Sequence, residues 1–147
     1  MAIDVFKSTA KLTDGIRIEC SSRDHKIVLD EPKNLGGSDE GMNPVEAVLC
    51  SLGACQCIVA KSFAKVKNIN LEDFWVEIEG NLDTDGFTGK NKDTRIGLQE
   101  IRTKVHIKSS SPEEEIKKFV KFIEHTCPVE DTIKNSANLS SEIVIEK

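Results

Sequence analysis

Residues 43–66, NPVEAVLCSLGACQCIVAKSFAKV, form the longest apolar run of the sequence and carry three of its five cysteines. Asn43 has a side chain that caps helices, Pro44 suits the first helical position, and Glu46 falls near the positive end of the helix dipole. Apolar residues then recur at steps of three and four on one face: Val45, Val48, Leu49, Leu52, Val59, Phe63 and Val66. The run predicts a long helix that is buried inside a domain.

Three thiols lie on this predicted helix. Cysteine is often a small, inert, buried hydrophobe, and this is our interpretation of Cys50 and Cys57. Cys55 differs because it falls three residues after Leu52 and four before Val59, at the edge of the apolar stripe. At that edge the helix would meet whatever packs against it, so a chemical role for Cys55 depends on a partner.

Length, charge and cysteine count narrow the class of protein. A chain of 147 residues with 38% hydrophobic content and no linker predicts one domain over residues 1–147. The net charge of −5, with both signs interspersed, argues against binding to nucleic acid. The N-terminus lacks a signal pattern and polar residues interrupt the long helix, which argues against a membrane span. Five cysteines without dense spacing indicate a reducing compartment, so we expect a cytoplasmic protein.

The other segments predict an α+β domain, in which an antiparallel sheet packs against helices. Alternating apolar residues indicate strands, Gly and Pro mark the loop over residues 30–42, and Ser111 followed by Pro112 starts a second helix. The basic residues of the strand at 96–108 could pair across the sheet with Glu77 and Glu79. By range, strands are expected at 3–6, 15–20, 25–30, 71–81, 96–108 and 138–146, further helices at 111–124 and from Pro128, and a hydrophilic connection at 82–95.

The last cysteine precedes a helix start. If Cys127 caps the helix that begins at Pro128, its sulfur faces free backbone N–H groups and the positive dipole end, which favour the thiolate. The negative charge of Glu130 disfavours the thiolate. The alternative is that Cys127 is an ordinary thiol that caps the helix or packs in the core. Two cysteines far apart in sequence could meet and form a disulfide after one is oxidised to a sulfenic acid. That is the chemistry of a thiol peroxidase.

Two other uses of these side chains fit less well. Zinc binding by Cys55, Cys57, His125 and Cys127 is disfavoured, because helix residues two apart point about 200° away from each other and no CxxC pair occurs. A cysteine hydrolase would need a histidine beside one of the thiols. The sequence places none there: His25 and His106 fall on strand surfaces, and His125 at a helix end.

Paired motifs resemble a known family. The segment from Gly36-Gly37 through Asn43-Pro44-Val45-Glu46 to Leu52-Gly53-Ala54-Cys55, with the later Cys127-Pro128-Val129, is similar to the OsmC/Ohr family of osmotically inducible and organic hydroperoxide resistance proteins. The order of predicted elements agrees over nearly the whole chain. The resemblance implies an intertwined homodimer, in which strands of both subunits wrap two long central helices and active sites lie at the subunit interface.

The resemblance also implies roles for the cysteines. It makes Cys55 the attacking cysteine and Cys127 the resolving one, whereas dipole reasoning alone would make Cys127 the more acidic thiol. We adopt the family's assignment, because partner groups can outweigh a helix end.

An arginine and a glutamate accompany the attacking sulfur in the organic hydroperoxide members. Val45 stands where those members place the glutamate, and Glu46 follows it, as in other branches of the family. Thr13 stands where they place the arginine, and Arg17 is the nearby substitute, with an ordinary surface arginine as the alternative. The candidate catalytic residues are therefore Cys55, Cys127, Glu46 and Arg17.

The implied function is a thiol-dependent peroxidase that reduces organic hydroperoxides to alcohols through a Cys55 sulfenic acid and a Cys55–Cys127 disulfide. An external dithiol would restore both thiols, and no metal, flavin or haem cofactor is expected. Apolar neighbours, Leu52, Val59 and Phe63, would favour bulky peroxides. The alternative is a non-enzymatic protein of the same fold, either a redox sensor or a binder of small apolar ligands, which the departures at Val45 and Thr13 favour.

Overall fold

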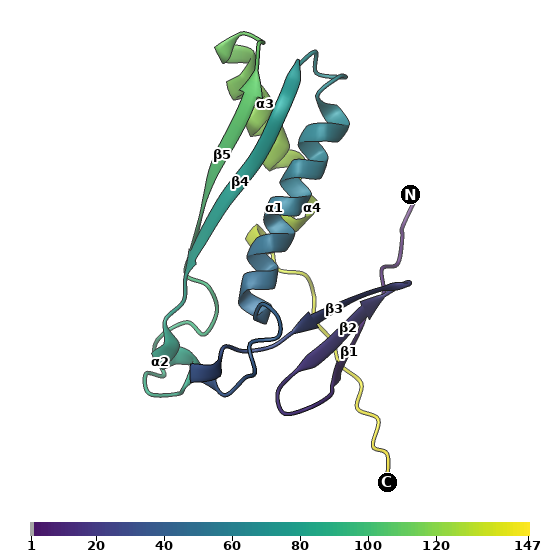
Figure 1. Ribbon diagram of the computed structural model, residues 1–147, viewed down its shortest axis with the longest axis vertical. Coiled ribbons are helices and arrows are strands. Elements are labelled where there is room, and N and C mark those ends of the chain that lie inside the picture. The colour runs from purple at the N-terminus through teal and green to yellow at the C-terminus, as the bar shows by residue number, and fades with distance from the viewer. Residues whose placement is uncertain (1) are drawn as a thin grey trace. The chain divides into compact units, whose positions relative to one another are not determined.

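A computed structural model describes residues 2–147, and Figure 1 shows their helices and strands. The chain divides into two compact units, one up to Cys50 and one from Ser51 onward. In chain order the elements are β1 (Thr9–Leu12), β2 (Ile18–Ser22), β3 (His25–Leu29), the 3-10 helix η1 (Lys33–Leu35), α1 (Pro44–Phe63), β4 (Leu71–Asn81), α2 (Thr84–Phe87), β5 (Glu100–Ser109), α3 (Glu113–Thr126) and α4 (Pro128–Lys134).

The first unit begins with an antiparallel meander, β1-β2-β3. Its first turn is closed by a hydrogen bond from the Thr13 N–H to the Arg17 carbonyl (2.9 Å), and Gly15 supplies the positive φ of +56° that the turn needs. The meander confirms the predicted topology, but the first strand was wrongly placed at residues 3–6. A hairpin pairs outward from its turn, so the segment next to the turn, Thr9–Leu12, forms β1 although residues 3–6 are more apolar.

A buried carboxylate fixes the loop that follows the meander. Asp30 is only 2% exposed, and its side chain accepts backbone N–H bonds from Glu31 (2.8 Å), Ser38 (3.1 Å) and Glu40 (3.2 Å). Burial alone would raise the pKa of Asp30, but these hydrogen bonds outweigh it and the net pKa is lowered. The turn is so tight at Gly37 that a Cβ there would overlap the carbonyl group of Glu31. The loop therefore delivers the chain to α1 in one conformation.

A reciprocal cap starts α1. Asn43 Oδ1 accepts the Glu46 N–H and Glu46 Oε2 accepts the Asn43 N–H, both at 2.8 Å, which is a capping box. The predicted N-cap is thus confirmed. By length and apolar composition alone, α1 is the one helix of residues 2–147 that could span a membrane. The expectation of a fully buried helix is wrong, because the buried residues of α1 are only Leu52, Gln56, Val59 and Ala60.

The second unit contains the antiparallel pair β4-β5, in which Val76 lies opposite Val105. The strand predicted at 71–81 is confirmed, while the second strand begins later than predicted, at Glu100. The predicted pairs on Glu77 and Glu79 are confirmed: Arg102 Nε and Lys104 Nζ form ion pairs with Glu79 (2.8 Å) and Glu77 (3.6 Å), and His106 Nε2 lies within hydrogen-bond distance of Glu77 (2.6 Å). On the same face the rings of Trp75 and His106 stack, with centroids 4.5 Å apart.

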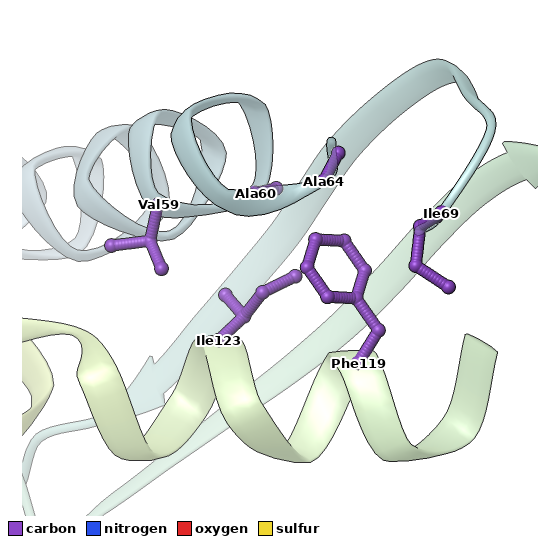
Figure 2. Close-up of a cluster of buried hydrophobic side chains, with 6 residues drawn as sticks. All are labelled: Val59, Ala60, Ala64, Ile69, Phe119 and Ile123. Carbon is purple, nitrogen blue, oxygen red and sulfur yellow. The ribbon is translucent and has the colours of Figure 1, made fainter. Parts of the chain in front are cut away.

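The core of this unit lies where α3 packs along α1. Figure 2 shows Phe119 and Ile123 of α3 pointing toward side chains from α1 and the turn after it. Small residues on the α1 side leave room for the Phe119 ring, which is 2% exposed. The core cluster consists of Val59, Ala60, Ala64, Ile69, Phe119 and Ile123.

Helix α3 confirms the predicted amphipathic helix, but it begins later than expected, with Pro112 rather than Ser111 as N-cap. The Ser111 hydroxyl instead accepts the backbone N–H of Asn70 at 2.9 Å, so it is engaged by the turn that leads into β4.

Two further predictions differ from the structure. The hydrophilic connection at 82–95 contains the short helix α2, which Asp83 caps by accepting the Asp85 N–H (2.9 Å). The strand expected at 138–146 is not formed, and Leu139 and Ile143 are 96% and 84% exposed. An alternating pattern yields a strand only where it pairs with a sheet edge, and within the described residues this segment pairs with no strand.

Candidate active site

The two implied redox cysteines lie together in the second unit. Cys55 sits in the middle of α1 and is partly exposed, whereas Cys127 lies between α3 and α4 and is fully buried. The Cys127 Sγ caps α4 and accepts the Glu130 N–H at 3.4 Å. Burial and the neighbouring Cys55 side chain raise the pKa of Cys127 to about 11. Cys127 is therefore a thiol at neutral pH and Cys55 is the sulfur that solvent can reach.

The helix dipole predicted that Cys127 would be the more acidic thiol, and this prediction was wrong because its pKa is raised. The expected cap is present, and the backbone N–H groups of Glu130 and Val129 do lower the pKa of Cys127. The loss of solvation on burial is the larger effect, because a thiolate in an apolar environment gives up its hydration.

A polar pair missed by the sequence analysis borders the cysteines. Gln56 is 1% exposed and its Nε2 donates to Glu130 Oε2 at 2.9 Å, while its Oε1 is buried without a partner. The other Glu130 oxygen, Oε1, lies 2.6 Å from Lys134 Nζ. The available signal was Gln56 itself, a polar residue four positions after Leu52 and three before Val59, on the buried stripe of the helix.

A cavity of about 280 Å³ adjoins this region within the second unit. Apolar side chains, including Leu52 and Ile133, line it together with Glu130 and Lys134. Two apolar residues expected to favour bulky peroxides have other packing partners. Val59 packs in the core, and Phe63 packs edge-on against Phe122 with ring centroids 5.2 Å apart.

The other two candidates lie in the first unit. Arg17 Nε bonds Glu40 Oε2 at 2.7 Å, and Arg17 Nη1 donates to Thr13 Oγ1 at 3.0 Å. The guanidinium thus lies at Thr13, the position where the family resemblance expects an arginine. The structure pairs Arg17 with Glu40, which the sequence analysis did not single out, whereas the Glu46 carboxylate caps α1.

Cys50, Cys57 and His106 have environments that differ from those of Cys55 and Cys127. Burial raises the pKa of Cys57, as expected for a structural thiol. The interpretation of Cys50 as a buried thiol is wrong, because Cys50 is exposed. His106 is held on the sheet by Trp75 and Glu77. Among residues 2–147, no group of three or more His, Cys, Asp or Glu side chains could hold a metal ion.

The family model described as "OsmC-like protein" matches residues 37–142. The chain belongs to the OsmC-like family. The family identified from the Gly36–Cys55 and Cys127–Val129 motifs is thereby confirmed, together with the α+β fold class.

Relatives of this OsmC-like chain cover nearly its full length. The hydroperoxide reductase of Mycoplasma genitalium is 33% identical over 141 residues, which are 95% of this chain and 94% of the relative. The hydroperoxide reductase of Mycoplasma pneumoniae is 29% identical over 139 residues, covering 94% and 93%. The crystal structure of an OsmC like protein from Mycoplasma pneumoniae superposes with a TM-score of 0.79 at 28% identity, covering 90% of this chain and 89% of that one.

Proposed function

We propose that this OsmC-like chain is a thiol-dependent peroxidase that reduces organic hydroperoxides to alcohols. The observation that carries the proposal is the neighbouring pair of a reachable Cys55 and a buried, protonated Cys127. Two relatives that span nearly the whole chain are named hydroperoxide reductase, which supports the same activity.

The reaction divides into two steps at the cysteines. The Cys55 thiolate attacks the terminal peroxide oxygen, so that an S–O bond forms, the O–O bond breaks, and the departing alkoxide takes a proton to become the alcohol. Cys127 then attacks the Cys55 sulfenic acid. The S–S bond forms, the S–O bond breaks, and the Cys127 proton leaves with the hydroxyl group as water. An external dithiol supplies two electrons and two protons to restore both thiols.

Arg17 is the proposed cationic group for the peroxide and the thiolate. Its contact with Thr13 supports this role, because the charge then occupies the position that the family's arginine would fill. Glu40 orients the guanidinium through the bond to Nε, and the Asp30 carboxylate holds the Glu40 backbone in turn. Glu46 stays a candidate for the acidic partner in this chemistry.

We further propose that the working unit is a cytoplasmic homodimer. One face of α1 is exposed along its length, with Val48 43% and Ile58 66% exposed. Both chain ends also expose apolar side chains, such as Phe6 at 92% and Ile143 at 84%. Exposed apolar surface of this extent is typical of interfaces, and a second copy of the chain would cover it.

Thiol counting tests the proposed mechanism. Each protein receives about one equivalent of cumene hydroperoxide, and free thiols and remaining peroxide are measured. We expect the wild type to lose two thiols, Cys55→Ser to consume no peroxide, and Cys127→Ser to hold a sulfenic acid that dimedone traps. Retention of all five thiols with persistent peroxide would exclude the enzyme and favour the ligand-binding alternative.

Substrate preference gives a second check. The cavity with Leu52 and Ile133 in its lining supports a preference for organic peroxides. The value of kcat/KM for cumene hydroperoxide should exceed that for hydrogen peroxide by about tenfold or more, as expected from burying a bulky apolar group. Equal values would contradict the proposed substrate class.

A further inference from the structure

The hydrogen bond between Gln56 and Glu130 joins the two elements that carry the cysteines. Gln56 directly follows Cys55 on α1, and Glu130 lies three residues after Cys127 in the first turn of α4. The Gln56 Nε2–Glu130 Oε2 distance is 2.9 Å, and the Glu130 N–H also donates to Cys127 Sγ at 3.4 Å. Glu130 therefore links Gln56 to the resolving sulfur: its side chain is held by Gln56, and its backbone N–H holds Cys127 Sγ.

Fold stability does not explain the residue at position 56. Gln56 lies in the buried stripe of α1, 1% exposed, and its Oε1 has no partner there. A buried amide with an unpaired acceptor is unfavourable, and a leucine would continue the stripe without that cost.

Helix α4 has few anchors of its own beyond the buried Cys127 that caps it. It is seven residues long and has no buried side chain of its own. Among the contacts described here, the bond to Gln56 is the polar link that ties its first turn to α1.

We propose that Gln56 and Glu130 are positioning residues for disulfide formation, which keep the Cys127 sulfur within reach of Cys55 during the second step. This inference rests on the proposed peroxidase function. Neither residue exchanges a bond or a proton in the reaction. Disulfide formation demands a narrow range of Cα separation and dihedral angle between the two cysteines, whereas the first step does not involve the Cys127 sulfur. Loss of the link should therefore slow the second step selectively.

Single-turnover kinetics test this selectivity. With about one equivalent of cumene hydroperoxide, Glu130→Ala and Gln56→Leu should form the disulfide about tenfold or more slowly than wild type. Gln56→Leu, whose residue is not among those that line the cavity, should in addition consume peroxide at the wild-type rate. Sulfenic acid should accumulate and be trapped by dimedone. Gln56→Leu is the second variant in case Glu130→Ala does not fold, because leucine maintains the apolar packing. Thermal unfolding verifies that each variant is folded.

Two matched variants separate positioning from other roles of Glu130. Glu130→Gln can still accept the Gln56 N–H bond and should retain the wild-type rate of disulfide formation. Lys134→Ala removes the ion pair on the other carboxylate oxygen and should also leave that rate unchanged. Disulfide formation at the wild-type rate in folded Glu130→Ala and Gln56→Leu, or failure of Glu130→Gln to restore it, would overturn the proposal.

An equilibrium measurement tests the positioning role of Gln56 and Glu130 independently of the proposed peroxidase activity. In redox buffers of reduced and oxidised dithiothreitol, the Cys55–Cys127 disulfide forms without peroxide, and its stability reports the effective concentration of the two thiols. We expect a decrease of about tenfold in Gln56→Leu and Glu130→Ala. If wild type consumes no peroxide while this decrease is found, the function fails and the positioning role stands. An unchanged equilibrium together with unchanged disulfide kinetics would exclude the positioning role.

Discussion

The Cys127 side chain combines two opposing influences on its charge. Its sulfur caps α4, which favours the thiolate, yet it is fully buried, which favours the thiol. Burial dominates, so the pKa rises to about 11. In the proposed mechanism, Cys127 keeps this proton until the Cys55 sulfenic acid forms, and the same proton then leaves in water.

The Cys127 pKa predicts how stability depends on pH. Because the folded pKa lies above the unfolded one, this thiol contributes stability that is fully present below about pH 8.5 and is lost as the pH rises through about 11. The difference in unfolding free energy between reduced wild type and Cys127→Ser should shrink by about 2–3 kcal/mol over that range. Urea unfolding at pH 8 to 11 measures it, and a constant difference would contradict the assigned burial effect.

Asp30 predicts the opposite behaviour at low pH. Its folded pKa is lowered, so its contribution is full above the ordinary carboxyl pKa and is lost as the pH falls through the lower folded value. Asp30→Asn should therefore reduce stability at pH 7 and flatten its decline in acid. The matched control is Asp24→Asn at an exposed turn position, which should leave the acid dependence of urea unfolding unchanged.

At the scale of elements, the start of α1 is fixed by a local capping motif that can be recognised in the sequence. Asn43 and Glu46 form their two reciprocal bonds within one turn, so residue type and spacing were sufficient to predict the cap. Asn43→Ala should lower the free energy of unfolding by about 1 kcal/mol in chemical denaturation.

The substitution Glu46→Gln tests whether Glu46 has a catalytic role in addition to capping α1. A glutamine at this position can complete the same capping box, so stability should be retained within about 0.5 kcal/mol. If Glu46 acts on the peroxide or on Arg17 through its charge, kcat/KM for cumene hydroperoxide should fall while the unfolding curve is unchanged. Full activity would restrict Glu46 to capping and leave Glu40 as the acidic partner of Arg17.

Elements set by local signals were predictable, and those set by distant partners were not. The strand at 71–81 and the cap at Cys127 follow from alternation and from Pro128. The strand expected at 138–146 depends on a sheet edge that its own sequence does not encode. The Gln56–Glu130 pair was missed for the same reason, since a polar residue on an apolar stripe does not reveal what it contacts 74 positions away.

At the scale of the whole molecule, the exposed apolar surface predicts the assembly. The chain should sediment as a particle of twice its 16.3 kDa mass, because a second copy would cover the outer face of α1 and the chain ends. Ile58→Asp places a charge on that face and should shift the equilibrium toward monomer, whereas Lys121→Ala on the exposed side of α3 should not. A wild-type monomer at micromolar concentration, measured by sedimentation velocity, would contradict the proposed homodimer.

The stacked Trp75 and His106 rings have a practical consequence for such experiments. Trp75 is the only tryptophan of the chain, which contains no tyrosine, so intrinsic ultraviolet emission originates at a single point on the β4-β5 pair. Tryptophan fluorescence therefore reports unfolding of the second unit and does not report unfolding of the β1-β2-β3 meander that carries Arg17. Circular dichroism reports on both units, and two midpoints that differ between these signals would reveal that the units unfold separately.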